Sequence, residues 1–186
     1  MKKILSLLLI GAVTVMGSQS FAKDRTREVI KQIQKKDAMV VKTIEMEYKK
    51  FGNRYFIRIN PGQPIIATIK DFCKQKNITL ASVSGVGSLQ SVTLGFFNPK
   101  TKDYKEKVLK EPLEMANLAG NITTKDGEPV LHFHTTVAGN NYKAYAGHMV
   151  EAEVSLTAEI ILDAIPGKIE KTYDPRTGLN LFDFTK

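Results

Sequence analysis

The sequence predicts an α+β domain in which one mostly antiparallel β-sheet packs against one main α-helix. Strand-like runs succeed one another along most of the chain, and short turns separate most of them. Only one segment has the spacing of a long amphipathic helix. Short connections between consecutive strands favour antiparallel pairing. The chain of 186 residues is long enough for one domain with its own hydrophobic core.

The first 22 residues have the features of a secretory signal peptide. Lys2 and Lys3 form a basic start, residues 4–16 are apolar, and Ser20-Phe-Ala22 is a small-x-small cleavage site. The apolar stretch is too short for a comfortable membrane span. We therefore expect an exported protein, periplasmic or secreted, without a stable membrane anchor.

Residues 23–50 are polar and are predicted to form an arm before a folded domain at 51–186. The first predicted strand of that domain covers residues 55–60. Its apolar and polar side chains alternate as they do in a half-buried strand. The turn signal Pro61-Gly-Gln-Pro64 follows it directly.

After this turn the apolar residues recur at helical spacing. Ile65, Ile69 and Phe72 fall on one stripe, which predicts an amphipathic helix that ends near Asn77. Cys73, the only cysteine, lies on the same stripe. We expect it to be a buried structural thiol rather than a nucleophile, and a single cysteine excludes an intrachain disulfide.

The rest of the chain is predicted to be strands and turns. The predicted strands cover residues 79–84, 91–97, 104–109, 113–123, 129–138 and 154–165. Asn98-Pro99 and Asp126-Gly127 carry turn chemistry, and the second pair is typical of a hairpin. Gly85-Val-Gly-Ser88 precedes a strand, so it lacks the helix N-terminus that a phosphate-binding loop needs. It is predicted to mark a bend or a close approach of two strands.

The composition limits the classes of partner that the protein can have. The formal net charge is +8 at pH 7, but the lysines are spread along the chain without the aromatic interleaving of a nucleic-acid-binding stripe. We expect a solvated basic surface, with nucleic acid an unlikely partner.

All three histidines of the chain lie within seventeen residues. His132 and His134 are two apart on a predicted strand, so their side chains point to the same face. If the following turn is centred on Asn140, His148 pairs directly with His132. Directly opposed residues have Cβ atoms ~4.5–5.5 Å apart. Three imidazole nitrogens could then reach one ion at ~2.0–2.1 Å.

Three histidines favour zinc (Zn²⁺) and leave a fourth position for water or a ligand, with nickel, copper or iron as alternatives. In the simpler interpretation, the histidines only form hydrogen bonds on a half-buried face. Glu151, Glu153 and Glu159 could add a ligand or a general base, and the simpler interpretation of Glu159 is an ion pair at an edge or an interface. No motif activates a serine or cysteine, and no catalytic residue or organic cofactor site is identified.

Several motifs, taken in order, resemble the plants and prokaryotes conserved (PPC) domain from about Arg54 to the end of the chain. They are Arg58-Ile-Asn-Pro-Gly62, Ser84-Gly-Val-Gly-Ser-Leu89, Gly120-Asn121, Asp126-Gly127, His132-Phe-His134, Gly147-His148, Thr157-Ala-Glu-Ile160 and Tyr173-Asp-Pro-Arg-Thr-Gly-Leu179. The resemblance implies an α/β fold on a mostly antiparallel sheet, a homotrimer, and metal binding by His132, His134 and His148. Plant relatives carry a separate DNA-binding hook, which has no counterpart here.

Three functions follow from these observations. The first is an exported, trimeric module that binds zinc and an unknown small ligand. The second is a zinc-dependent hydrolase or lyase that uses the three-histidine site. The third is a structural or DNA-associated assembly protein in which the histidines only pack or form hydrogen bonds. The sequence leaves open whether one chain or neighbouring subunits complete the site.

Overall fold

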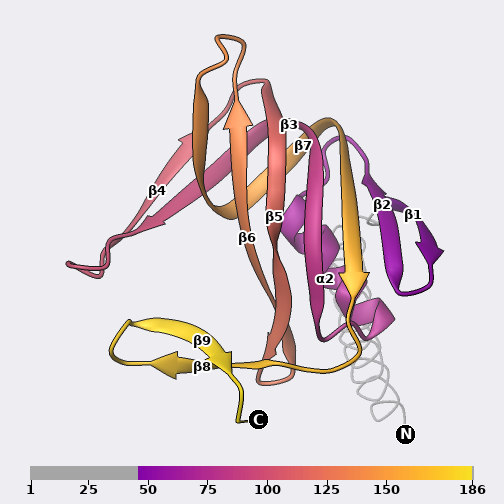
Figure 1. Ribbon diagram of the computed structural model, residues 1–186. Helices are drawn as coiled ribbons and strands as arrows, with labels where there is room; N and C mark the ends of the chain where they lie inside the picture. The colour runs from indigo at the N-terminus through magenta and orange to yellow at the C-terminus, as the bar shows by residue number, and fades with distance from the viewer. Residues whose placement is uncertain (1–45, 186) are drawn as a thin grey trace, which may run out of the picture. The chain divides into compact units, whose positions relative to one another are not determined.

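The structure, a computed structural model, describes residues 46–185 (Figure 1). The predicted signal peptide and most of the predicted arm lie outside these residues. The first strand, β1, covers Met46–Phe51, so the sheet begins before the predicted domain boundary at residue 51. No helix in the described part of the chain is long and apolar enough to cross a membrane.

The described residues form one nine-stranded sheet with one α-helix against it. After β1 the strands are β2 (Arg54–Ile59), β3 (Ala81–Phe97), β4 (Tyr104–Leu109), β5 (Leu113–Lys125), β6 (Glu128–Ala138), β7 (Ala144–Ala164), β8 (Glu170–Asp174) and β9 (Leu179–Asp183). The main path runs β1-β2-β7-β3-β5-β8-β9, while β4 pairs with β3, and β6 pairs with β5 and β7. Every pairing is antiparallel except a parallel bridge between β5 and β8. The predicted mostly antiparallel sheet with one helix is confirmed.

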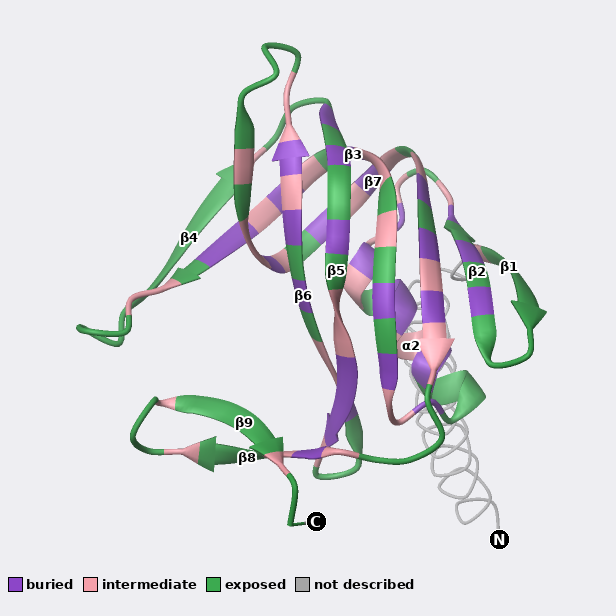
Figure 2. Cartoon of the chain, in the orientation of Figure 1, coloured by how far each residue is buried: buried purple, intermediate pink, exposed green. Residues whose placement is uncertain are grey.

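The helix α2 (Ile65–Lys76) packs against β6 and β7. It follows Pro64 and ends at Asn77, whose φ of 53° is left-handed, a conformation that asparagine tolerates. Its buried residues recur three and four apart and join the core under the sheet. Figure 2 shows the matching alternation of buried and exposed residues along β2 and β5. The predicted helix is confirmed.

The thiol of Cys73 is expected to resist alkylation in the folded protein. Cys73 is fully buried, and burial raises the pKa of its thiol to about 12. At pH 8 only about 0.01% of such a thiol is in the reactive thiolate form. Iodoacetamide should therefore label the protein only after unfolding in guanidinium, as mass spectrometry would report. Rapid labelling of the native protein would contradict the burial.

The two strands predicted at 79–84 and 91–97 are one strand, β3. Its register with the neighbouring strands shifts near Gly85 and Gly87. A methyl group on Gly85 would lie 2.5 Å from Ile160 Cδ1, and one on Gly87 would lie 2.5 Å from the Thr157 carbonyl oxygen. The glycines therefore allow β7 to approach closely, as predicted, and the bulge lets the strand continue through the irregularity.

Candidate metal centre

The structure brings all three histidines together within one chain. His132 and His134 lie on β6, and His148 lies near the start of β7. Phe133, between the first two, points the other way and is fully buried in the core. The candidate ligand atoms of the three imidazoles all lie within 4.8 Å of one another. The strand alternation predicted from the sequence therefore places the imidazoles on the outer face of the sheet.

The predicted register across the hairpin is wrong by two residues. His148 pairs with His134, and the hairpin is centred on Asn141 rather than Asn140. Five residues, 139–143, join the strands, and the backbone N–H of Tyr142 donates to the Gly139 carbonyl oxygen at 2.9 Å. A shift of two residues keeps every side chain on its face. The three histidines consequently still converge.

The arrangement of the imidazoles fits a single metal ion. The ring centroids are 5.3, 5.4 and 5.6 Å apart, so the rings form a nearly equilateral triangle. Three nitrogens at 2.0–2.1 Å from a tetrahedral ion would be about 3.4 Å apart. Small side-chain rotations would bring the imidazole nitrogens, which now lie within 4.8 Å of one another, to this spacing. Three nitrogen donors suit a divalent transition ion.

The electrostatic surroundings keep two of these histidines neutral. The pKa of His132 is lowered to about 4, mainly by burial and then by the nearby charges of Lys171, His148 and His134, in that order of importance. Burial also lowers the pKa of His148, with smaller contributions from His134 and Lys171. A neutral imidazole has a free lone pair, which is the form that binds a metal. Both side chains are therefore ready to ligate at pH 7.

Asn121 on β5 is placed to orient His132. The two residues are direct partners across β5 and β6. The Asn121 side-chain oxygen is buried and has no hydrogen-bond partner among the described residues. A metal-binding histidine usually donates its second ring N–H to an oxygen of this kind. If His132 turns toward a bound ion, its second ring N–H can donate to the Asn121 side-chain oxygen, and this buried acceptor then has a partner.

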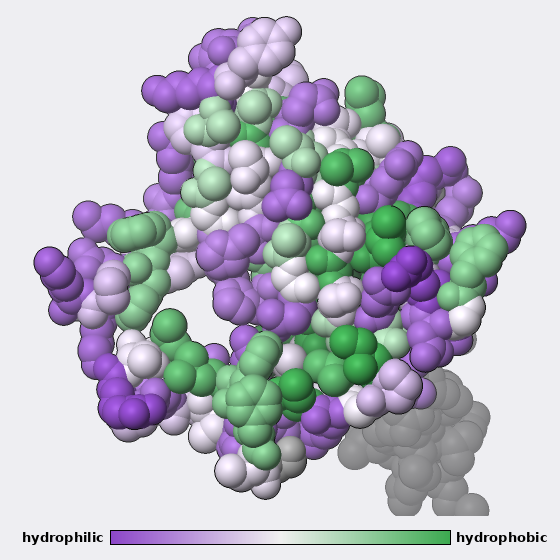
Figure 3. Space-filling view, viewed as in Figure 1, coloured by the Kyte–Doolittle hydropathy of each residue, from purple (hydrophilic) through white to green (hydrophobic). Residues whose placement is uncertain are grey.

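The histidines open into a pocket of about 1200 Å³. Its walls come from the end of β3, the start of β4, strands β5 and β6, the start of β7, and the hairpin β8–β9. Figure 3 shows a hollow at this place, with hydrophobic side chains along its lower edge. Glu151, Glu153 and Glu159 do not line it; Glu159 lies opposite Arg58 of β2 instead. The described residues around the histidines thus include no carboxylate.

Asn121, Tyr104 and Lys171 are among the pocket residues that sequence reasoning missed. The ring of Tyr104 lies 6.5 Å from that of His148, centroid to centroid. A signal for Lys171 was present, because two short alternating segments flank the turn sequence Asp174-Pro-Arg-Thr-Gly178. That pattern is typical of the hairpin that the structure contains.

Comparison with known proteins identifies the fold family. Residues 46–166 match the Plants and Prokaryotes Conserved domain. A provisionally assigned DNA-binding protein of Bacteroides thetaiotaomicron is 40% identical, with a TM-score of 0.74, over 76% of this chain and 99% of its own. A metal-containing protein of Archaeoglobus fulgidus is 31% identical, with a TM-score of 0.66, over 76% and 99% of the two chains.

A plant- and prokaryote-conserved protein of Pyrococcus horikoshii is 33% identical, with a TM-score of 0.66, over 77% of this chain and 98% of its own. No curated protein matches the sequence. The resemblance drawn from the sequence motifs is therefore confirmed, and the chain belongs to the Plants and Prokaryotes Conserved domain family.

Proposed function

We propose that this protein is an exported, homotrimeric module that binds one divalent transition metal and a small ligand. The ion is held by His132, His134 and His148. The observation that carries the proposal is the convergence of their ligand atoms within 4.8 Å at the base of a pocket. The similarity to a metal-containing protein of Archaeoglobus fulgidus supports it.

Zinc is the first choice for the ion. Three neutral nitrogen donors and an open fourth position are typical of zinc sites that bind water or a ligand. Nickel, copper and iron also accept imidazole ligands, so metal analysis has to include them. A bound ion would act as a Lewis acid toward whatever occupies the open position.

The pocket favours binding over hydrolysis or lyase chemistry. A zinc hydrolase commonly uses a nearby acid or base to move protons. No aspartate or glutamate among the described residues lines this pocket. With all three histidines assigned to the ion, the titratable side chains left in the described lining are Tyr104 and Lys171, whose ordinary pKa values lie well above 7. A binding module is therefore the better fit.

Self-association into a trimer is supported by a second surface. Phe56 and Val86 are 44% and 51% exposed on the face of the sheet that points away from α2. They line a groove of about 660 Å³ that is also bordered by Glu47, Arg58 and Glu159. Large exposed apolar side chains beside charged ones are typical of protein interfaces. Neighbouring copies of the chain would cover them.

The test is the metal content and mass of the protein purified without a histidine tag after expression of the full chain. We expect about one zinc ion per chain and the mass of three chains in solution. A metal-free protein whose folding and assembly survive loss of His132 and His134 would contradict the proposal. Hydrolysis of model esters or phosphates that disappears in His148→Ala would instead support the enzyme alternative.

A further inference from the structure

The pocket above the histidines has an excess of positive charge. Lys171 on β8 is the only lysine, arginine, aspartate or glutamate among the described residues that line it. Lys171 is partly buried, makes no ion pair with a described carboxylate, and has its pKa lowered by burial. Three neutral imidazoles leave the two charges of a bound divalent ion uncompensated. An anion would offset both the ion and the ammonium group.

The opposite part of the pocket is apolar. The hairpin β8–β9 and the residues after it contribute Leu179, Leu181, Phe182 and Phe184, all of them exposed. Phe184 is 81% exposed. Phe96 and Phe97, at the end of β3, belong to the facing wall. Such a concentration of exposed apolar side chains around a cavity marks a ligand-binding surface.

Lys171 lies where the charged and apolar parts meet. Its ammonium nitrogen is 5.4 Å from the centre of the Phe182 ring, its direct partner across β8 and β9. At this distance the ring attracts the ammonium group and restrains its position. The same ammonium is close enough to the histidines to influence the pKa values of His132 and His148. It therefore adds positive charge to the part of the pocket that the histidines line.

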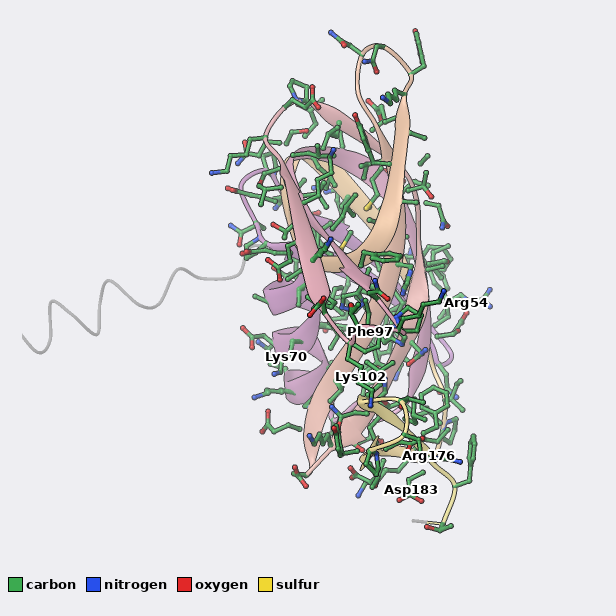
Figure 4. The ribbon with its side chains drawn as sticks, turned by 90° about the vertical axis from the view of Figure 1, so that its left-hand side faces the viewer. Arg54, Lys70, Phe97, Lys102, Arg176 and Asp183 are labelled. Carbon is green, nitrogen blue, oxygen red and sulfur yellow. The ribbon has the colours of Figure 1, made fainter. Side chains whose placement is uncertain are left out.

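A contact between two hairpins frames the pocket. Lys102, in the turn after β3, donates through its ammonium group to the Pro175 carbonyl oxygen at 3.2 Å. A methyl group on Gly178 would lie 3.6 Å from Lys102 Cδ and 3.9 Å from Phe97 Cζ, which shows how closely the turns approach. Figure 4 shows Phe97 and Lys102 beside the segment that carries Arg176. The pocket is thus bounded on two sides by paired strands.

We propose that this pocket binds a small organic carboxylate with an apolar body. The carboxylate occupies the open position of the ion and pairs with Lys171, and the apolar body lies against the hairpin β8–β9. This inference rests on the proposed metal-binding function and adds the chemical class of the ligand. A pocket of about 1200 Å³ has ample room for an aromatic or branched aliphatic acid.

The test is calorimetric titration of the zinc-loaded full-length protein with four probes: phenylacetate, phenylacetamide, acetate and inorganic phosphate. We expect phenylacetate to bind at least about tenfold more tightly than the others, because only it has both the carboxylate and the apolar body. Lys171→Met should weaken phenylacetate binding about tenfold without changing zinc content. Lys105→Met, on β4 and outside the pocket lining, is the control with the same charge change and should leave affinity unchanged.

Three results would overturn the inference. One is equal affinity of the unaltered protein and Lys171→Met for phenylacetate. Another is equal affinity for phenylacetate and for acetate or phosphate, which would show that the apolar wall does not contribute to ligand binding. The third is a Leu181→Ala variant that binds phenylacetate normally but loses its assembly, because the hairpin would then be a subunit interface. The zinc content distinguishes failure of this inference from failure of the proposed function. A zinc-loaded protein that binds none of the four probes contradicts only the ligand class, whereas a metal-free protein contradicts the proposed function.

Discussion

His134→Ala is expected to weaken zinc binding by about 100-fold or more, since even residues that only support a metal ligand cost 10–100-fold when removed. His134 is the corner of the triangle that joins the two strands, because it shares β6 with His132 and pairs directly with His148 of β7. Its removal leaves two nitrogen donors, one on each strand. Two donors do not complete the three-nitrogen face of a tetrahedral site.

The matched control for this variant is Thr136→Ala. Thr136 is the next outward-facing residue of β6 and lies outside the pocket lining. Competition with a chromophoric chelator would measure the zinc affinity of both variants. Because His134 is exposed, we expect the metal-free variant to keep the fold, as circular dichroism would report. Unchanged zinc affinity in His134→Ala would mean that the three histidines do not form one site.

The convergence of the histidines was predictable because strand periodicity is a local property. His132 and His134 are two apart, so any strand through them puts both imidazoles on one face. The exact partner of His148 was not predictable, because it depends on the conformation of a five-residue turn. In the structure Tyr142 has a φ of 59°, a left-handed conformation that is rare for a bulky residue and has no sequence signal.

The remaining parts of the pocket depend on contacts between distant segments. The turn sequence between β8 and β9 is typical of a hairpin, but it does not indicate which part of the sheet the hairpin attaches to. One bridge and a few hydrogen bonds attach it to β5, including one from the Thr124 hydroxyl to Glu170 Oε1 at 3.0 Å. This attachment helps to place Lys171 in the same pocket as the histidines. Local sequence patterns contain no information about it.

Gly120→Ala is expected to reduce both the stability of the fold and the affinity for zinc. Gly120 on β5 pairs directly with Phe133, between the two histidines of β6. A methyl group at this position would overlap the His132 carbonyl oxygen and lie 2.7 Å from Phe133 Cδ1. Because one of these obstacles is backbone, β6 has to move. Overpacking of this kind costs about 3 kcal/mol.

Such a loss corresponds to a fall of about 10 °C in the unfolding midpoint of a domain of this size. Displacement of His132 should also weaken zinc binding about tenfold, since metal sites require close positioning of each ligand. Gly139→Ala is the matched control, because a methyl group there would meet only the Glu111 carboxylate, at an ordinary 3.7 Å. Thermal unfolding of both variants with a chelator present separates the folding effect from the metal effect. Equal unfolding midpoints of Gly120→Ala and Gly139→Ala would show that β5 and β6 have room to separate at Gly120. A normal zinc affinity in a destabilised Gly120→Ala would show that the metal centre does not depend on the spacing of these two strands.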